Sequence, residues 1–197
     1  MAFNAQPGEQ YTIRRKVLKL FGASFHVFAP DGSVVAFCKQ KAFKLREDIR
    51  LYTDESCTTE LLVIKARQVI DFSATYDVTL PTGQVLASLR RKGMASTFLK
   101  DSWLVFDPHG RELATLTERG NFLAFLRRWV DFVSLLSPQT FTLERAGKPS
   151  IAQYRTHFNL FVYRLGVSIL ADDPEIDDLV ILACGCLIAA VEGRQQG

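Results

Sequence analysis

Leu179–Val191 is an unbroken run of 13 apolar residues, LVILACGCLIAAV, near the end of a chain of 197 residues. As an α-helix this run would be about 20 Å long, whereas the hydrocarbon core of a bilayer requires about 30 Å. Residues 172–178 before it are acid-rich, and Asp177 and Asp178 stand where an N-cap and a first-turn acid stabilise a helix. The run therefore predicts a buried helix rather than a membrane span. Because it is apolar on every face, other structure must surround it on all sides.

The rest of the chain is typical of β-hairpins. A Pro-x-Gly tripeptide occurs three times between runs of β-forming residues, and a further glycine-containing tip occurs once. Proline presets the first turn position, and glycine supplies the left-handed residue that closes a hairpin. The four predicted tips are Pro30–Gly32, Pro81–Gly83, Pro108–Gly110 and Arg145–Lys148. Further strands are predicted at Tyr11–Leu20, Ile49–Tyr52, Leu61–Arg67 and Phe161–Leu170.

Two of these hairpins repeat each other at a constant offset of 51 residues. The matched positions include a strand valine, the turn glycine and two basic residues that follow the second strand. These pairs are Val27 and Val78, Gly32 and Gly83, Lys39 and Arg90, and Lys41 and Lys92. Too few such units fit into the chain to build a propeller. The pattern predicts one antiparallel sheet that closes on itself and thereby removes its edges.

One amphipathic helix is expected within this β structure. In Asn121–Leu136, large apolar side chains recur every three or four residues, whereas Arg127, Arg128 and Asp131 take the other side. We expect this helix to pack on the outside of the sheet. The alternative is that its aromatic face and its arginine pair dock on a membrane.

Several segments, in matching order, resemble those of the LURP-one-related proteins. They are Lys39–Ile49, Ile64–Arg67, Asp71–Val78 and Arg90–Gly93, and the ending Ala183–Ile188 is similar to the C-terminus of phospholipid scramblases. These two groups and the tubby domains share the tubby C-terminal-like fold. The resemblance implies an all-β domain with two helices over residues 11–197, after a flexible segment of residues 1–10. It also implies a closed antiparallel barrel of about twelve strands around the hydrophobic C-terminal helix.

The sequence does not favour an enzyme. It contains no nucleophile elbow, phosphate-binding loop or dinucleotide-binding loop, and His26, His109 and His157 are scattered. A barrel that is filled by its own helix also leaves little room for a substrate pocket. We therefore expect neither catalysis nor a cofactor. In the superfamily that the chain resembles, tubby domains bind phosphoinositide headgroups, and scramblases are associated with calcium-triggered movement of phospholipids.

Charge is unevenly distributed along the chain. There are 24 Lys and Arg against 21 Asp and Glu, but five of the acids lie within residues 172–178. The remainder carries 24 bases against 16 acids, a net charge of +8. Its two basic clusters follow the repeated strands and consist of Lys39, Lys41, Lys44 and Arg46, and of Arg90, Arg91 and Lys92. Because converging cations bind phosphate, these clusters predict a lipid-headgroup site. The alternative is ordinary solvated charge near strand ends.

The acids of residues 172–178 are interpreted mainly as a cap and a solubilising lead-in to the final helix. Asp172, Asp173 and Asp177 are also candidates for a divalent-cation site, but the alternating ligands and turn glycine of an EF-hand are missing. The cation site is therefore the less favoured alternative. Nucleic acid is not an expected partner, because no aromatic residues are interleaved with the bases for stacking.

Cellular location and function class follow from these features. Cys38, Cys57, Cys184 and Cys186 have neither the spacing of a metal site nor a CxxC motif, so they are predicted to be buried thiols. With no secretory signal at the N-terminus, they indicate the cytoplasm. We predict a phospholipid- or phosphoinositide-binding module at the membrane periphery, of which a scramblase-like protein would be one form. The alternative is a soluble structural or protein-interaction domain with no lipid ligand.

Overall fold

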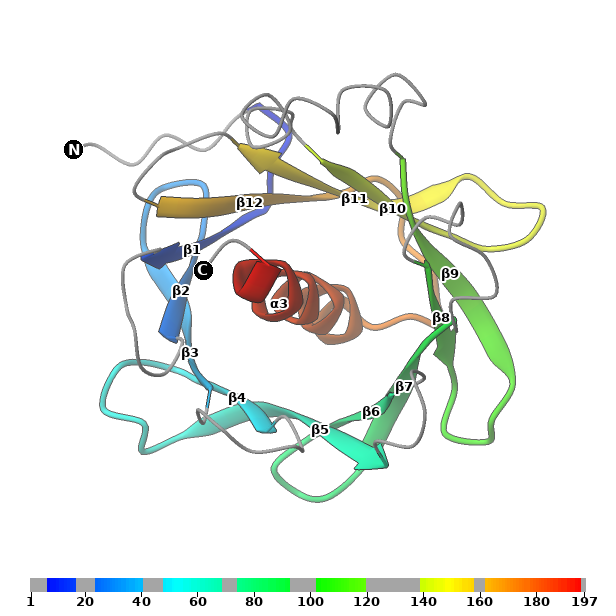
Figure 1. Cartoon of the computed structure of the whole chain (residues 1–197), viewed down its shortest axis with the longest axis horizontal. Coiled ribbons are helices and arrows are strands. Elements are labelled where there is room, and N and C mark those ends of the chain that lie inside the picture. Colours follow the sequence, from blue (N-terminus) through cyan, green and yellow to red (C-terminus); the bar gives the residue numbers. More distant parts are fainter. Residues whose placement is uncertain are drawn as a thin grey trace.

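In a computed structural model, the strands form one closed antiparallel barrel around a helix (Figure 1). The structure describes residues 7–16, 24–40, 48–68, 74–92, 102–119, 139–157 and 162–195. Within these residues the elements are β1 (Tyr11–Lys16), β2 (Ser24–Phe28), β3 (Val34–Gln40), β4 (Asp48–Tyr52), β5 (Glu60–Gln68), β6 (Thr75–Thr79), β7 (Val85–Arg91), β8 (Ser102–Phe106), β9 (Glu112–Glu118), β10 (Thr140–Glu144), β11 (Ser150–His157), β12 (Val162–Ile169) and α3 (Asp178–Gln195). Each strand pairs with its neighbours in sequence, and β1 pairs with β12 to close the sheet. The predicted barrel is confirmed.

Side chains along the strands alternate between the interior of the barrel and its outer face. In β2, β4 and β6 every second residue is buried, so that Phe25 and Val27 of β2 point inward.

The four strands predicted outside the hairpins correspond to β1, β4, β5 and β12, with ends that agree within a residue or two where the chain is described. Residues 17–20 of the first predicted strand, and the predicted helix Asn121–Leu136, lie outside the described residues.

Helix α3 runs through the middle of the barrel, as Figure 1 shows. Every residue from Val180 to Ala190 is buried, which confirms that this apolar run is surrounded on all sides. The helix lies close to the wall at Gly185, where an added Cβ would lie 3.0 Å from Ile13 Cδ1. The phenol of Tyr154 donates a hydrogen bond to the carbonyl oxygen of Ile181 at 2.9 Å. No helix in the described part of the chain is long and apolar enough to cross a membrane.

The three predicted Pro-x-Gly hairpins share one turn geometry. Gly32, Gly83 and Gly110 have φ angles of +86°, +88° and +84°, which only glycine adopts without strain. The N–H of each donates to the carbonyl oxygen three residues earlier, at 2.9–3.0 Å. The predicted repeat is also confirmed, because Val27 and Val78 occupy equivalent places and each pairs with an alanine of the following strand.

The barrel has two different ends. The tight connections 29–33, 53–59, 80–84, 107–111 and 145–149 all lie at one end, and so does the segment 170–177 that leads into α3. We call this the hairpin end. The final residues of β1, β3, β5, β7, β9 and β11 lie at the opposite end, which we call the distal end.

The cysteines follow the prediction with one exception. All four are free, and Cys38, Cys184 and Cys186 are buried. Burial raises the pKa of all three thiols, that of Cys184 to about 12. Cys57 is only partly buried, because it lies in the turn between β4 and β5, where its φ angle is +56°. For Cys57 the prediction of a buried thiol was wrong.

Candidate functional site

Basic side chains at the hairpin end are held by carboxylates. Arg145 donates to Asp173 at 2.8 and 3.0 Å and also to Glu175. Arg111 pairs with Asp107 at 3.0 Å and with Glu175 at 2.5 Å. The ammonium of Lys148 lies 3.5 Å from Asp173. These pairs fasten the segment before α3 to the tips of the β8–β9 and β10–β11 hairpins.

The same pairs define the role of the acid-rich stretch. The side chain of Asp173 is only 4% exposed. Burial raises the pKa of this carboxyl, but hydrogen bonds from the Glu175 N–H and from Arg145 outweigh burial and lower it. Hydrogen bonds from Arg111 and Arg145 likewise lower the pKa of Glu175. Asp177 accepts a hydrogen bond from the N–H of Leu179 at 2.7 Å, so its predicted capping role is confirmed.

Asp172, Asp173 and Asp177 are the candidate ligands of the divalent-cation alternative. In the structure Asp173 contacts Arg145 and Lys148, and Asp177 caps α3, so these two carboxylates serve different partners. Among the described residues, no group of three or more His, Cys, Asp or Glu side chains is placed to hold a metal ion. Asp173 and Glu175 instead form ion pairs with Arg145 and Arg111, and we call this set of ion pairs the clamp. The sequence does not predict it.

Toward the distal end the cations are differently placed. Several of them contact no carboxylate within the described part of the chain, although each is on or beside a strand. They are Lys39, Lys65, Arg90, Lys92 and Arg155. At the hairpin end the three cations described above are therefore neutralised, whereas the distal half has both paired arginines, such as Arg67, and cations that contact no carboxylate of the described residues. An anion approaching the distal half meets the attraction of these charges directly.

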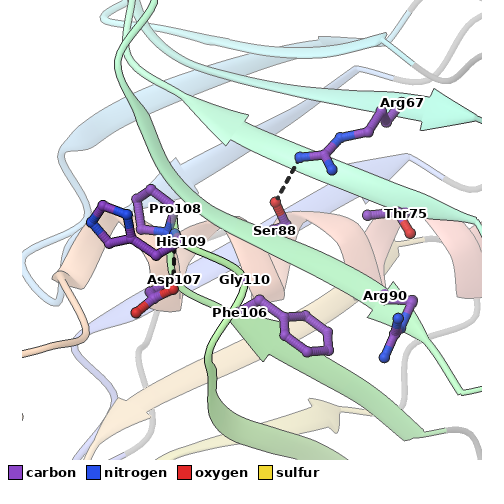
Figure 2. Close-up of a pocket in the computed structure, with 9 residues that line it drawn as sticks. All are labelled: Arg67, Thr75, Ser88, Arg90, Phe106, Asp107, Pro108, His109 and Gly110. Carbon is purple, nitrogen blue, oxygen red and sulfur yellow. Dashed lines mark hydrogen bonds between the residues drawn. The ribbon is translucent and has the colours of Figure 1, made fainter.

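Arg90 lies in an open groove on the outer face of β5 to β8. The groove has a volume of about 370 Å³. We call it the Arg90 groove; its lining residues are Arg67, Thr75, Ser88, Arg90, Phe106, Asp107, Pro108, His109 and Gly110. Strand alternation sends Ala87 and Leu89 into the core and therefore Arg90 outward. Figure 2 shows Arg90 beside the Phe106 ring, and its guanidinium carbon lies 4.6 Å from the ring centroid.

The opposite wall of the Arg90 groove is a hydrogen-bonded network. Arg67 donates to both carboxylate oxygens of Asp77, at 2.9 and 2.7 Å. Ser88 donates to Asp77 at 2.7 Å, and Arg67 also reaches the Ser88 hydroxyl at 3.4 Å (Figure 2). Burial raises the pKa of Asp77, but the hydrogen bonds from Arg67 and Ser88 outweigh it and lower the pKa. One wall thus has an arginine already neutralised, and the other has Arg90 stacked on an aromatic ring.

The predicted headgroup residues are only partly brought together. Arg90 and Lys92 are exposed, but Arg91 is half-buried and lies over the buried Trp103 ring, 6.0 Å from its centroid. Arg91 therefore does not face the Arg90 groove, because consecutive strand residues point to opposite sides of a sheet. Lys39 is exposed on β3, four strands away from β7. Lys41 and Lys44 lie outside the described residues.

The sequence does not predict which residues line the groove together with Arg90. Phe106 and Arg67 belong to β8 and β5, which border the groove only because the meander places them next to β7 and β6. The register pairs Ser88 with Phe106, so Arg90 reaches that ring diagonally across the two strands. No local signal near residue 106 marks this contact. Only the pairing of β7 with β8 could have revealed it.

A comparison with known protein families gives one match. The LURP-one-related family model matches residues 34–188, from the start of β3 to the middle of α3. The chain belongs to the LURP-one-related family. This family is part of the tubby-like superfamily, so the predicted relationship is confirmed. No curated protein matches the chain.

Family membership carries a coarse statement about function. The LURP-one-related family and its tubby-like barrel suggest a domain of the lipid-binding type. LURP-one-related and other tubby-like proteins are generally non-enzymatic. The family match is independent of the Arg90 groove, which is a feature of this chain's own structure.

Proposed function

We propose that this LURP-one-related protein is a peripheral membrane protein of the cytoplasm that binds the phosphorylated headgroups of anionic phospholipids in the Arg90 groove. The observation that carries the proposal is Arg90 itself, whose guanidinium contacts an aromatic ring and, within the described residues, no carboxylate. Arginine is suited to this role because its planar fork of donors matches phosphate oxygens. Stacking on Phe106 restricts the guanidinium before the ligand arrives, which lowers the entropic cost of binding.

The ligand is proposed to be a headgroup rather than an enclosed acyl chain. Helix α3 occupies the interior of the barrel with buried side chains from Val180 to Ala190. The Arg90 groove, at about 370 Å³, is near the lower limit of about 300 Å³ for small-molecule sites. Lys92 next to it, and Lys39 farther along the same half of the barrel, add attraction of about 1 kcal/mol each near an anionic surface.

Vesicle co-sedimentation tests the proposal. Phosphatidylcholine vesicles that contain phosphatidylserine or phosphatidylinositol 4,5-bisphosphate should sediment the wild-type protein, whereas pure phosphatidylcholine vesicles should not. Binding should weaken as salt is raised above 0.15 M, where the screening length is about 8 Å. Arg90→Glu with Lys92→Glu should abolish binding and leave the melting temperature nearly unchanged, because exposed charges contribute little to stability.

The matched control reverses the same amount of charge away from the Arg90 groove. Arg119→Glu with Lys148→Glu should retain vesicle binding, although it removes exposed ion pairs with Glu144 and Asp173. If both double variants lose binding equally, net charge rather than the Arg90 groove is responsible. If the wild type ignores anionic vesicles even at low salt, the lipid proposal fails and a protein-interaction domain replaces it.

A further inference from the structure

A second polar cluster lies on the opposite side of the barrel from the Arg90 groove. Its centre is the carboxylate of Glu9, just before β1, which is only 8% exposed. Thr12 donates to Glu9 Oε2 at 3.2 Å, and Nε2 of His157 contacts Glu9 Oε1. A guanidinium nitrogen of Arg164 lies 3.7 Å from Glu9 Oε2. Side chains from β1, β11 and β12 thus converge on one carboxylate.

Gly166 makes the space for this carboxylate. It lies on β12 between Thr12 of β1 and Arg155 of β11, and a Cβ built on it would be 1.9 Å from Glu9 Oε1. Any other residue at this position would collide with the Glu9 side chain. A backbone hydrogen bond next to Glu9 also holds this segment against β12, since the Gln10 N–H donates to the carbonyl oxygen of Val167 at 2.9 Å. Gly166, His157 and Arg164 therefore surround a small space that the Glu9 carboxylate occupies.

Basic side chains from three neighbouring strands surround this carboxylate. Arg14 and Arg164 are register partners on β1 and β12, and His157 pairs with Arg164 from β11. Arg155 is the register partner of Gly166. All four side chains project outward from the sheet, because Ile13, Tyr154 and Leu165, which alternate with them along the strands, are buried in the core. Glu9 thus lies on a face of the sheet that has three arginines and a histidine.

We propose that this face is a second anion site, specific for a phosphate monoester, and that Glu9 occupies it as an internal stand-in for the ligand. A phosphate monoester carries a charge of about −1.5 to −2 at pH 7 and three acceptor oxygens, so it matches the arginines better than a single carboxylate does. The ligand must displace Glu9, which keeps its affinity for the wild-type chain low. The site lies six strands from β6, so it does not depend on the proposed function of the Arg90 groove.

The test removes the stand-in from the full chain. Glu9→Ala should bind inorganic phosphate at least tenfold more tightly than the wild type by calorimetry at fixed ionic strength. Bound phosphate should also raise the melting temperature of the variant but not that of the wild type. If Glu9→Ala does not fold, Glu9→Ser takes its place. Phosphate affinity equal to that of the wild type in the folded variant overturns the proposal.

Gly166→Ala provides a readout that needs no ligand. Alone it should destabilise the protein, because its methyl group takes the place of the Glu9 carboxylate. Combined with Glu9→Ala it should cost much less and should block phosphate binding. If the cost of Gly166→Ala is the same with and without Glu9, the glycine does not serve this carboxylate and the proposal is wrong.

A matched control uses another Glu–His pair. Glu55 lies 2.5 Å from His26, which packs against Phe28 and Phe37 instead of a glycine. Glu55→Ala should therefore create no phosphate site, and phosphate binding by this variant would contradict the specificity of the Glu9 cluster. Vesicles with and without phosphatidic acid then identify the source of the monoester. Binding of Glu9→Ala to phosphatidic acid vesicles assigns a lipid, and binding to phosphate alone assigns a soluble ester.

Discussion

Single residues of α3 show how tightly the barrel is filled. Tyr154 anchors the helix through the carbonyl of Ile181, and Gly185 lets it approach Ile13. Neither residue has a distinctive signal in the sequence, where Gly185 is one small residue in an apolar run. The burial of the run could be predicted because it is apolar on every face. Which residue faces which strand could not, because that depends on the register of twelve strands.

Leu187→Asp tests the burial of α3 at a single position. Leu187 is 1% exposed, so an aspartate there would be a charge without a partner in the core. We expect a loss of about 5 kcal/mol, from the lost apolar packing and the buried charge together. This is as large as the total stability of many domains, so the chain should fail to fold as judged by urea denaturation. Leu170→Asp is the control, because Leu170 is 54% exposed and the same change should be nearly neutral. Equal stability of the two variants would contradict a buried helix.

At the scale of elements, the segment before α3 is the main departure from the sequence interpretation. The sequence predicts that its acids form a cap and a solubilising lead-in, and Asp177 does cap the helix. Asp173 and Glu175 instead fasten the segment to Arg145 and Arg111, which are distant in sequence. The hairpins could be predicted because each depends on a few adjacent residues. The clamp could not, because it joins residues that only the closed barrel brings together.

The clamp predicts acid sensitivity. The pKa values of Asp173 and Glu175 are lowered from their ordinary values of 3.8 and 4.5 by folding. As the pH falls, the unfolded chain therefore binds protons at these carboxyls before the folded chain does. The clamp contributes its full stability above about pH 5 and loses it as the pH falls below about 4. Arg145→Gln should reduce this dependence, measured as melting temperature between pH 3 and pH 7. Parallel curves for the wild type and Arg145→Gln would show that the clamp contributes nothing.

For the whole molecule, helix and barrel stabilise each other. The inward side chains of the strands pack on α3, so the sheet alone would leave its interior open to water. A chain that ends at residue 172 should therefore aggregate or lack a cooperative unfolding transition, as measured by calorimetry and near-ultraviolet circular dichroism. A soluble fragment 1–172 that unfolds cooperatively would mean that α3 is an accessory to a barrel that is stable without it.

Charge is also organised over the whole molecule. The sequence reveals the excess of bases and the two basic clusters, but it does not separate Arg90, which faces the groove, from Arg91, which lies over Trp103. It also does not show that the hairpin end neutralises its own arginines. These distinctions depend on strand alternation and on pairing between distant strands. They identify Arg90 as the candidate headgroup-binding residue within the basic clusters.

Calorimetric titration of soluble inositol 1,4,5-trisphosphate into the wild type and into Arg90→Gln tests the headgroup site most directly. The soluble headgroup separates recognition in the Arg90 groove from attraction to a membrane surface. A hydrogen bond between charged groups is worth about 1.5–3 kcal/mol, and each 1.4 kcal/mol is a tenfold change in affinity. Arg90→Gln should therefore raise the dissociation constant at least tenfold, whereas Lys148→Gln should leave it unchanged. Equal affinity of the wild type and a folded Arg90→Gln variant would contradict the account.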